Sequence, residues 1–141
     1  MTIHKKGSAH WEGDIKGKGT VSTESGVLSQ QPYGFNTRFE GGKGTNPEEL
    51  IGAAHAACFS MALSLMLGNA GHKPESIDTK ADVSLDKKGD GFAITKVALT
   101  STVSLPGIDK SAFDEIINNA KAGCPVSQLL NAEITLRSEE R

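Results

Sequence analysis

The sequence predicts an α+β protein, with mostly antiparallel sheets around a long buried central helix. Three observations support this fold class. Residues 50–67 form an apolar stretch suited to one helix, residues 77–105 have the pattern of a hairpin, and the first forty residues resemble short strands interrupted by glycine. Two shorter helices and a last strand complete an order of elements that is typical of an α+β protein.

The size and composition of the chain are those of an ordinary soluble globular protein. Its 141 residues suit one domain, or one compact unit with two small subregions, and we expect a single domain over residues 1–141. Hydrophobic residues make up 37% of the chain and charged residues 23%. The 15 basic and 17 acidic residues give a net charge of −2, so the chain lacks the electrostatic footprint of a nucleic-acid-binding protein.

The N-terminal part is predicted to form three strands separated by glycines, at residues 4–11, 19–25 and 34–40. In the third strand, Phe35, Thr37 and Phe39 would share one face. The glycine-rich residues 41–44 then predict a loop.

The central helix has clear start and stop signals. Asn46 can cap it, Pro47 suits the first helical position, and Glu49 stands three residues after the cap. We expect the helix to end near residue 70, with Gly71 as its stop. Because residues 50–67 are apolar or small on nearly every face, this helix should be surrounded by protein.

Two alternatives follow for the burial of this helix. An 18-residue apolar run could span a membrane, but its polar residues and many alanines favour a core helix. A helix of this length spans about 30 Å, which one short chain can hardly enclose. A second copy of the chain is the natural cover, so we expect a homodimer with no membrane contact.

The remaining elements follow from alternation and capping. They begin with a strand at 77–85, a turn at 87–91 and a strand at 92–105. A helix capped by Asp109 or Ser111 should then run through Ala120, with Phe113, Ile116 and Ile117 as its apolar stripe. A short helix at 125–130 and a strand at 133–137 complete the prediction.

The two cysteines are the candidate reactive groups. Residues 1–7 have no apolar stretch behind their lysines, so we expect no signal peptide and a cytoplasmic protein. In that compartment a pair of cysteines is more often catalytic or redox-sensing than a permanent disulfide. Cys58 lies in the buried helix, where an unassisted thiol packs as a small inert hydrophobe. It needs a nearby positive charge to become a nucleophile.

Arg38 and Cys124 are the next candidates. Arg38 is the one arginine in the body of the chain, because Arg137 and Arg141 sit in the C-terminal tail. A guanidinium stays charged when desolvated, so it could hold a thiolate, although a plain surface charge is an equal alternative. Cys124 lies at or beside the N-cap of a short helix, where free N–H groups favour an anion. Local chemistry therefore nominates Cys124 as the more acidic thiol and leaves open which cysteine attacks.

The other residues indicate no metal or cofactor. The four histidines lack the paired spacing of a zinc site, and no phosphate-binding loop or dinucleotide fingerprint is present. His55 stands three residues before Cys58, so the two are adjacent on the helix surface. It could be a base, but a packed, hydrogen-bonded histidine is the favoured interpretation.

Two motifs resemble a known family. Residues 44–50 leading into residues 53–59, together with Gly-Cys-Pro-Val-Ser at residues 123–127, resemble the OsmC/Ohr family of thiol-dependent hydroperoxidases, and the resemblance extends over essentially the whole chain. It implies an intertwined homodimer, no cofactor, a hydroperoxide substrate, a dithiol or lipoyl-type reductant, and a role in oxidative and osmotic stress defence.

The resemblance also implies the roles of four residues. Cys58 matches the peroxidatic cysteine, which is oxidised to a sulfenic acid, and Cys124 matches the resolving cysteine, which forms a disulfide with it. Arg38 and Glu48 match the arginine and glutamate around the peroxidatic sulfur. Glu48 and Cys58 are ten residues apart, about 15 Å along a straight helix. Either the helix bends or starts late, or the partner subunit supplies Glu48.

Two other functions use the same residues. A thiol–disulfide switch would carry the cysteine pair without peroxidase turnover, and multiple turnovers of cumene hydroperoxide with a dithiol would exclude it. In a small-molecule-binding or structural dimer both cysteines would be packing residues, and replacing Cys58 by serine would leave hydroperoxide protection unchanged.

Overall fold

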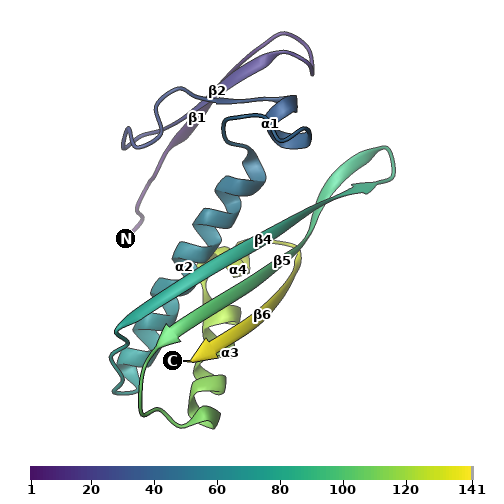
Figure 1. Cartoon of the computed structure of the whole chain (residues 1–141). Helices are drawn as coiled ribbons and strands as arrows, with labels where there is room; N and C mark the ends of the chain where they lie inside the picture. Colours follow the sequence, from purple (N-terminus) through teal and green to yellow (C-terminus); the bar gives the residue numbers. More distant parts are fainter. Residues whose placement is uncertain (141) are drawn as a thin grey trace. The chain divides into compact units, whose positions relative to one another are not determined.

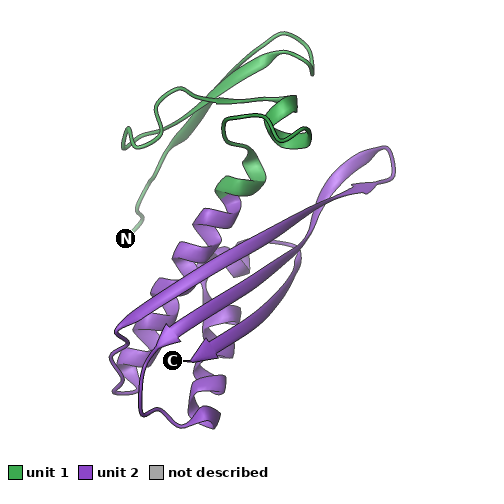
Figure 2. Cartoon of the chain, in the orientation of Figure 1, with its two compact units in different colours: residues 1–50 green, residues 51–141 purple. Residues whose placement is uncertain are grey.

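The protein has an α+β fold, as predicted (Figure 1). A computed structural model describes residues 1–140 of the chain. The elements follow in the order β1 (Gly7–Glu12), β2 (Lys18–Thr23), β3 (Gln31–Tyr33), α1 (Phe35–Phe39), α2 (Pro47–Asn69), β4 (Ser76–Lys88), β5 (Gly91–Ser104), α3 (Lys110–Gly123), α4 (Pro125–Leu129) and β6 (Glu133–Glu140). They form two compact units, residues 1–50 and the residues from Ile51 onward (Figure 2).

The first unit is built on a small antiparallel sheet of order β1-β2-β3. The predicted strands at 4–11 and 19–25 are therefore confirmed, each with slightly shifted ends. Trp11 and Tyr33 pack over the middle of the sheet, with ring centroids 5.5 Å apart. Gly19 lies beneath them, and an added Cβ would stand 2.6 Å from each ring. Only glycine leaves room for this pair of aromatic rings.

Residues 34–40 contain a helix, so the predicted third strand is wrong. Thr37 folds back on Gly34: its Oγ1 accepts the Gly34 N–H at 2.9 Å and donates to the Gly34 carbonyl at 3.0 Å. The rings of Phe35 and Phe39 contact each other with centroids 4.9 Å apart. Residues four apart share a face in a helix as well as in a strand. The aromatic spacing that suggested a strand therefore fits one helical turn equally well.

The second unit contains a sheet of order β4-β5-β6. β4 and β5 form the predicted antiparallel hairpin, which turns between Lys88 and Gly91. β6 pairs with β5 in parallel, and it continues to Glu140, beyond the predicted end. Arg137 lies in this strand, as the predicted strand at 133–137 requires, and not in a tail, whereas Arg141 lies outside the described residues. The sheets remain mostly antiparallel.

One face of this sheet carries the helices of the second unit (Figure 1). The shared core consists of buried apolar side chains from α2, β5 and α3 with the segments that follow β5 and α3: Phe59, Leu63, Leu67, Val97, Leu99, Val103, Leu105, Ile108, Phe113, Ile117, Ala120 and Cys124. Phe113 and Ile117 belong to the predicted stripe of α3, while Ile116 is only partly buried.

The long helix α2 begins and ends as predicted. Asn46 Oδ1 accepts the Glu49 N–H at 2.8 Å, and Gly71 follows the helix with a φ of 87°. A positive φ suits glycine, which has no Cβ to clash. The capping interactions therefore agree with the signals in the sequence.

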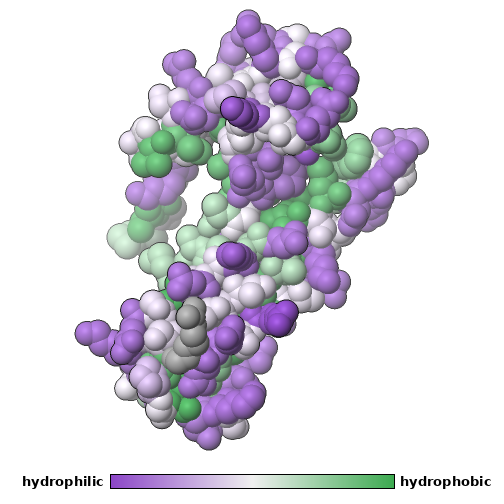
Figure 3. Space-filling view, viewed as in Figure 1, coloured by the Kyte–Doolittle hydropathy of each residue, from purple (hydrophilic) through white to green (hydrophobic). Residues whose placement is uncertain are grey.

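The chain by itself covers one stripe of α2, at spacings of three and four residues. Met61 is 75% exposed and Leu65 is 65% exposed, and apolar side chains remain at the surface of the chain (Figure 3). By length and composition α2 could cross a membrane, a test that core helices of soluble proteins also pass. One chain thus leaves part of α2 uncovered, as expected for a helix of this length, and its cover by a second copy stays a prediction.

The N-cap of α3 gives a stability prediction. Asp109 Oδ2 accepts the Ala112 N–H at 3.2 Å, so an Asp109→Ala variant is expected to lose about 1 kcal/mol of unfolding free energy. Asp109→Asn keeps an acceptor and should lose much less. Urea unfolding measures both changes, and an Asp109→Ala midpoint equal to that of the unchanged protein would contradict the capping role.

Candidate active site

The four predicted site residues form two pairs, one in each compact unit. Arg38 and Glu48 belong to the first unit, and Cys58 and Cys124 belong to the second. The structure brings together the members of each pair.

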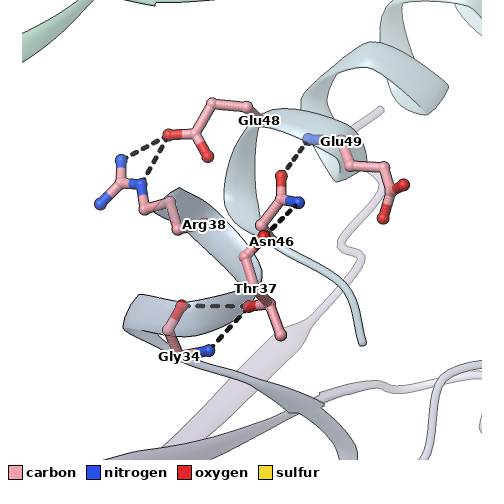
Figure 4. Close-up of polar contacts among 6 residues, drawn as sticks. All are labelled: Gly34, Thr37, Arg38, Asn46, Glu48 and Glu49. Atoms are coloured by element: carbon pink, nitrogen blue, oxygen red, sulfur yellow. Dashed lines mark hydrogen bonds and ion pairs between the residues drawn. The ribbon is translucent and has the colours of Figure 1, made fainter. Parts of the chain in front are cut away.

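Arg38 and Glu48 form an ion pair between α1 and the start of α2 (Figure 4). Arg38 Nε donates to Glu48 Oε1 at 2.8 Å, and Nη2 donates to the same oxygen at 2.5 Å. Glu48 is buried and the Arg38 side chain is 36% exposed. The carboxylate thus orients the guanidinium, while Nη1 takes no part in this pair.

The backbone around this ion pair is held by polar side chains. Asn46 Nδ2 donates to the Thr37 carbonyl at 3.2 Å, which ties α1 to the start of α2 (Figure 4). Thr37 in turn fixes the first turn of α1 through Gly34. Two short segments on either side of the glycine-rich loop therefore present Arg38 and Glu48 to each other.

An apolar pocket lies beside the guanidinium in the first unit. Its volume is about 180 Å³, and its lining includes Trp11, Tyr33, Phe35, Arg38, Phe39 and Pro47. A cation at the edge of an apolar pocket suits a ligand with an apolar body and a polar end.

The second pair consists of two free thiols, each of which shifts the pKa of the other. Cys58 lies on α2 and is half-buried, whereas Cys124 is fully buried with 0% of its surface exposed. Cys124 is the N-cap of α4, as predicted, and its Sγ accepts the Ser127 N–H at 3.4 Å. Of the two cysteines, Cys58 is the one that keeps some exposed surface in the single chain.

The surroundings move the pKa values of the two thiols in opposite directions. The pKa of Cys58 is raised, mainly by burial and also by the neighbouring Cys124. The Val126 N–H lowers this pKa, but only in part. Burial alone would raise the pKa of Cys124, but donors from Ser127, Cys58 and Val126 together lower it. Within the second unit, acidity favours Cys124 as the attacking nucleophile, whereas accessibility favours Cys58.

His55 is the packed, hydrogen-bonded histidine that was expected. It is fully buried, burial lowers its pKa, and its Nε2 lies 2.7 Å from Ser127 Oγ. Ser127 was not among the predicted site residues. Its place three residues after the N-cap cysteine is the signal that could have identified it, since the N-cap side chain accepts from that position.

Within residues 1–140, no three His, Cys, Asp or Glu side chains lie close enough together to hold a metal ion. The second pair offers the nucleophilic and redox chemistry of thiols.

Comparison with known proteins agrees with this chemistry. A sequence model described as OsmC-like protein matches residues 40–139. The chain is 82% identical over 137 residues to Peroxiredoxin OsmC of Escherichia coli (strain K12), which covers 96% of each chain. It is 30% identical over 122 residues to the organic hydroperoxide resistance protein OhrB of Bacillus subtilis (strain 168), covering 86% of this chain and 88% of that one.

The solved structures include the same fold. An organic hydroperoxide resistance protein from Elizabethkingia anophelis superimposes with a TM-score of 0.77 at 26% identity, covering 100% of both chains. The fold, the interacting thiols and these relatives together define a thiol-dependent peroxidase. More particularly, the chain belongs to the OsmC-like protein family.

Proposed function

We propose that this protein reduces organic hydroperoxides to alcohols, and hydrogen peroxide to water less efficiently, with Cys58 as the peroxidatic and Cys124 as the resolving cysteine. The observation that carries the proposal is the pair of interacting thiols, of which one is accessible and the other is buried. Reactive cysteines are partly exposed, which supports Cys58 as the sulfur that meets the substrate. The relatives named for hydroperoxide resistance support the substrate class.

The reaction divides into two steps on the protein. The Cys58 thiolate attacks the outer peroxide oxygen, the O–O bond breaks, and the alkoxide leaves and takes up a proton to become the alcohol. Cys58 is then a sulfenic acid. The Cys124 thiolate attacks its sulfur, hydroxide leaves, and a Cys58–Cys124 disulfide forms, which protects Cys58 from irreversible oxidation.

Arg38 and Glu48 are assigned to the first step. The surroundings of Cys58 within the second compact unit raise its pKa. The thiolate therefore needs a cation from elsewhere. Arg38, oriented by Glu48, would supply that charge and stabilise the charge that develops on the peroxide oxygen. The apolar pocket beside Arg38 would receive the organic group of the hydroperoxide.

A second copy of the chain would complete the site. α2 is one helix from Pro47 to Asn69, so it does not start after Glu48. A straight helix of ten residues rises by about 15 Å, so Glu48 and Cys58 would not share a small site within one straight helix. The exposed apolar side chains of α2 also call for a cover. We therefore assign a homodimer in which Arg38 and Glu48 of one subunit serve Cys58 of the other.

The remaining assignments complete the cycle. A dithiol or lipoyl-type reductant would return the disulfide to two thiols, and the protein would act in the cytoplasm in defence against oxidative and osmotic stress. The names of the relatives support a role in peroxide defence.

Mass spectrometry of the Cys124→Ser variant tests the two cysteine roles. After one equivalent of cumene hydroperoxide, this variant should retain sulfenic acid on Cys58 and convert it to sulfinic acid with excess peroxide. The unchanged protein, treated in the same way, should contain the Cys58–Cys124 disulfide. Sulfenic acid on Cys124 of a Cys58→Ser variant at the same rate would reverse the assignment.

A further inference from the structure

His55 is a fully buried histidine that the proposed cycle does not use. Its Nε2 lies 2.7 Å from Ser127 Oγ, and its Nδ1 is buried with no hydrogen-bond partner among the described residues. Burial lowers the pKa of His55, so its ring is neutral and carries one hydrogen. The position of that hydrogen decides what Ser127 can do.

The unpartnered nitrogen identifies the tautomer. A buried N–H without an acceptor is rare and costly, whereas a lone pair without a donor is tolerated more easily. The hydrogen of His55 therefore belongs on Nε2, where Ser127 Oγ accepts it. In the other tautomer, Nε2 has no hydrogen, so the Ser127 hydroxyl would have to donate its hydrogen to Nε2.

This tautomer leaves the hydroxyl hydrogen of Ser127 available to a second acceptor. The neighbouring acceptor is Cys124 Sγ, which accepts the Ser127 N–H at 3.4 Å, and the Ser127 side chain is among the groups that lower the pKa of Cys124. The groups that act on this sulfur are the donors of Ser127 and Val126 on α4 and the titratable thiol of Cys58 on α2. His55 reaches the sulfur through Ser127.

We propose that His55 is a positioning residue whose Nε2–H holds the Ser127 hydroxyl toward Cys124, so that the buried Cys124 sulfur leaves readily as a thiolate when a dithiol reduces the Cys58–Cys124 disulfide. The inference rests on the proposed function, because the disulfide belongs to that cycle. It specifies which sulfur is attacked during reduction. The reductant attacks the Cys58 sulfur, and His55 and Ser127 stabilise the Cys124 sulfur as it leaves.

The exposure of the two cysteines supports this assignment. Cys58 is half-buried and Cys124 is fully buried, so the Cys58 sulfur is the one we assign to attack by a thiolate of the reductant. The disulfide bond breaks, its electron pair goes to Cys124, and a mixed disulfide forms between Cys58 and the reductant. The second thiol of the reductant then displaces the Cys58 thiolate, and the oxidised dithiol leaves. A thiol of lower pKa is the better leaving group in such an exchange.

The test measures the Cys124 thiol alone, in a Cys58→Ser background. Ultraviolet thiolate absorbance is recorded against pH, and the signal of the Cys58→Ser/Cys124→Ser protein is subtracted. His55→Asn places its amide near the position of Nδ1, and Ser127→Ala keeps the N–H but removes the hydroxyl. Each change should raise the pKa of Cys124 by about one unit, the shift expected for loss of one hydrogen bond to a charged group.

Two controls separate positioning from packing. His55→Gln can place its amide N–H near the position of Nε2, so it should keep the pKa of Cys124 close to its original value. His10→Asn changes an exposed histidine and should have no effect. An unchanged pKa in His55→Asn, or equal rises in His55→Asn and His55→Gln, would overturn the proposal.

A second readout follows the disulfide in the protein with both cysteines. Its reduction by dithiothreitol should be roughly threefold slower in His55→Asn for a rise of one pKa unit, taking for the leaving sulfur a dependence as strong as the coefficient of about 0.5 known for the attacking sulfur. An unchanged rate would contradict the leaving-group role. Failure of the proposed function would appear differently, as no consumption of hydroperoxide by the unchanged protein.

Discussion

A Cys58→Ser variant is expected to lose turnover of cumene hydroperoxide by a factor on the order of a thousand or more, with dithiothreitol as the reductant. A serine hydroxyl stays protonated in this site, so no comparable nucleophile is available to attack the O–O bond. Stopped-flow measurement of hydroperoxide consumption would quantify the loss.

The matched control is Cys124→Ser, which retains the accessible sulfur. Without reductant it should consume one equivalent of hydroperoxide at close to the original rate, because Cys124 acts only after Cys58 is oxidised. This pair of variants tests which thiol attacks the hydroperoxide first, the more acidic Cys124 or the more accessible Cys58. Rapid oxidation of Cys58→Ser combined with slow oxidation of Cys124→Ser would show that the more acidic, buried thiol attacks first.

An Arg38→Ala variant is expected to oxidise Cys58 about a hundredfold more slowly, because it removes the cation assigned to the thiolate and to the departing oxygen. Arg38→Lys should recover only part of the rate, since an ammonium cannot reproduce the planar guanidinium that Glu48 Oε1 orients through Nε and Nη2. Lys43→Ala removes an exposed cation of the same unit and should change the rate little. An Arg38→Ala rate equal to that of Lys43→Ala would contradict the assignment.

Mixed dimers test which subunit supplies the arginine. Inactive Arg38→Ala and Cys58→Ser chains are unfolded together, refolded and assayed. If Arg38 serves the partner's cysteine, mixed dimers contain one complete site, and about a quarter of the original activity should return. If no activity returns, Arg38 and Cys58 of one active site come from the same subunit. A fully active monomer would contradict the shared site altogether.

The two halves of the chain differ in how far local patterns predict them. α2, α3 and the β4–β5 hairpin follow from caps and periodicity, which depend only on neighbouring residues. α1 does not, because residues spaced by four share a face in both secondary structures. The deciding contact, Thr37 to Gly34, is a side-chain hydrogen bond with no signature in hydrophobic spacing.

The candidate site shows the same limit. Cys124 could be placed at a helix N-cap from its neighbours, and the Arg38–Glu48 pairing agrees with the roles that the family resemblance implies. The place of Ser127 three residues after Cys124 is also a local signal, but its pairing with His55 could not be found in this way, because the two residues are 72 apart along the chain. Contacts of such long range depend on packing, which no local pattern encodes.

The sequence by itself determined the fold class, the capped helices, the family and the two cysteines as reactive groups, since each depends on local chemistry or on motifs. Tertiary structure decided that α1 is a helix, that β6 runs parallel to β5, and that one thiol is accessible while the other is buried. It also decided which side chains surround Cys124. Burial and the identity of neighbours depend on segments far apart in the chain, and only folding brings those segments together.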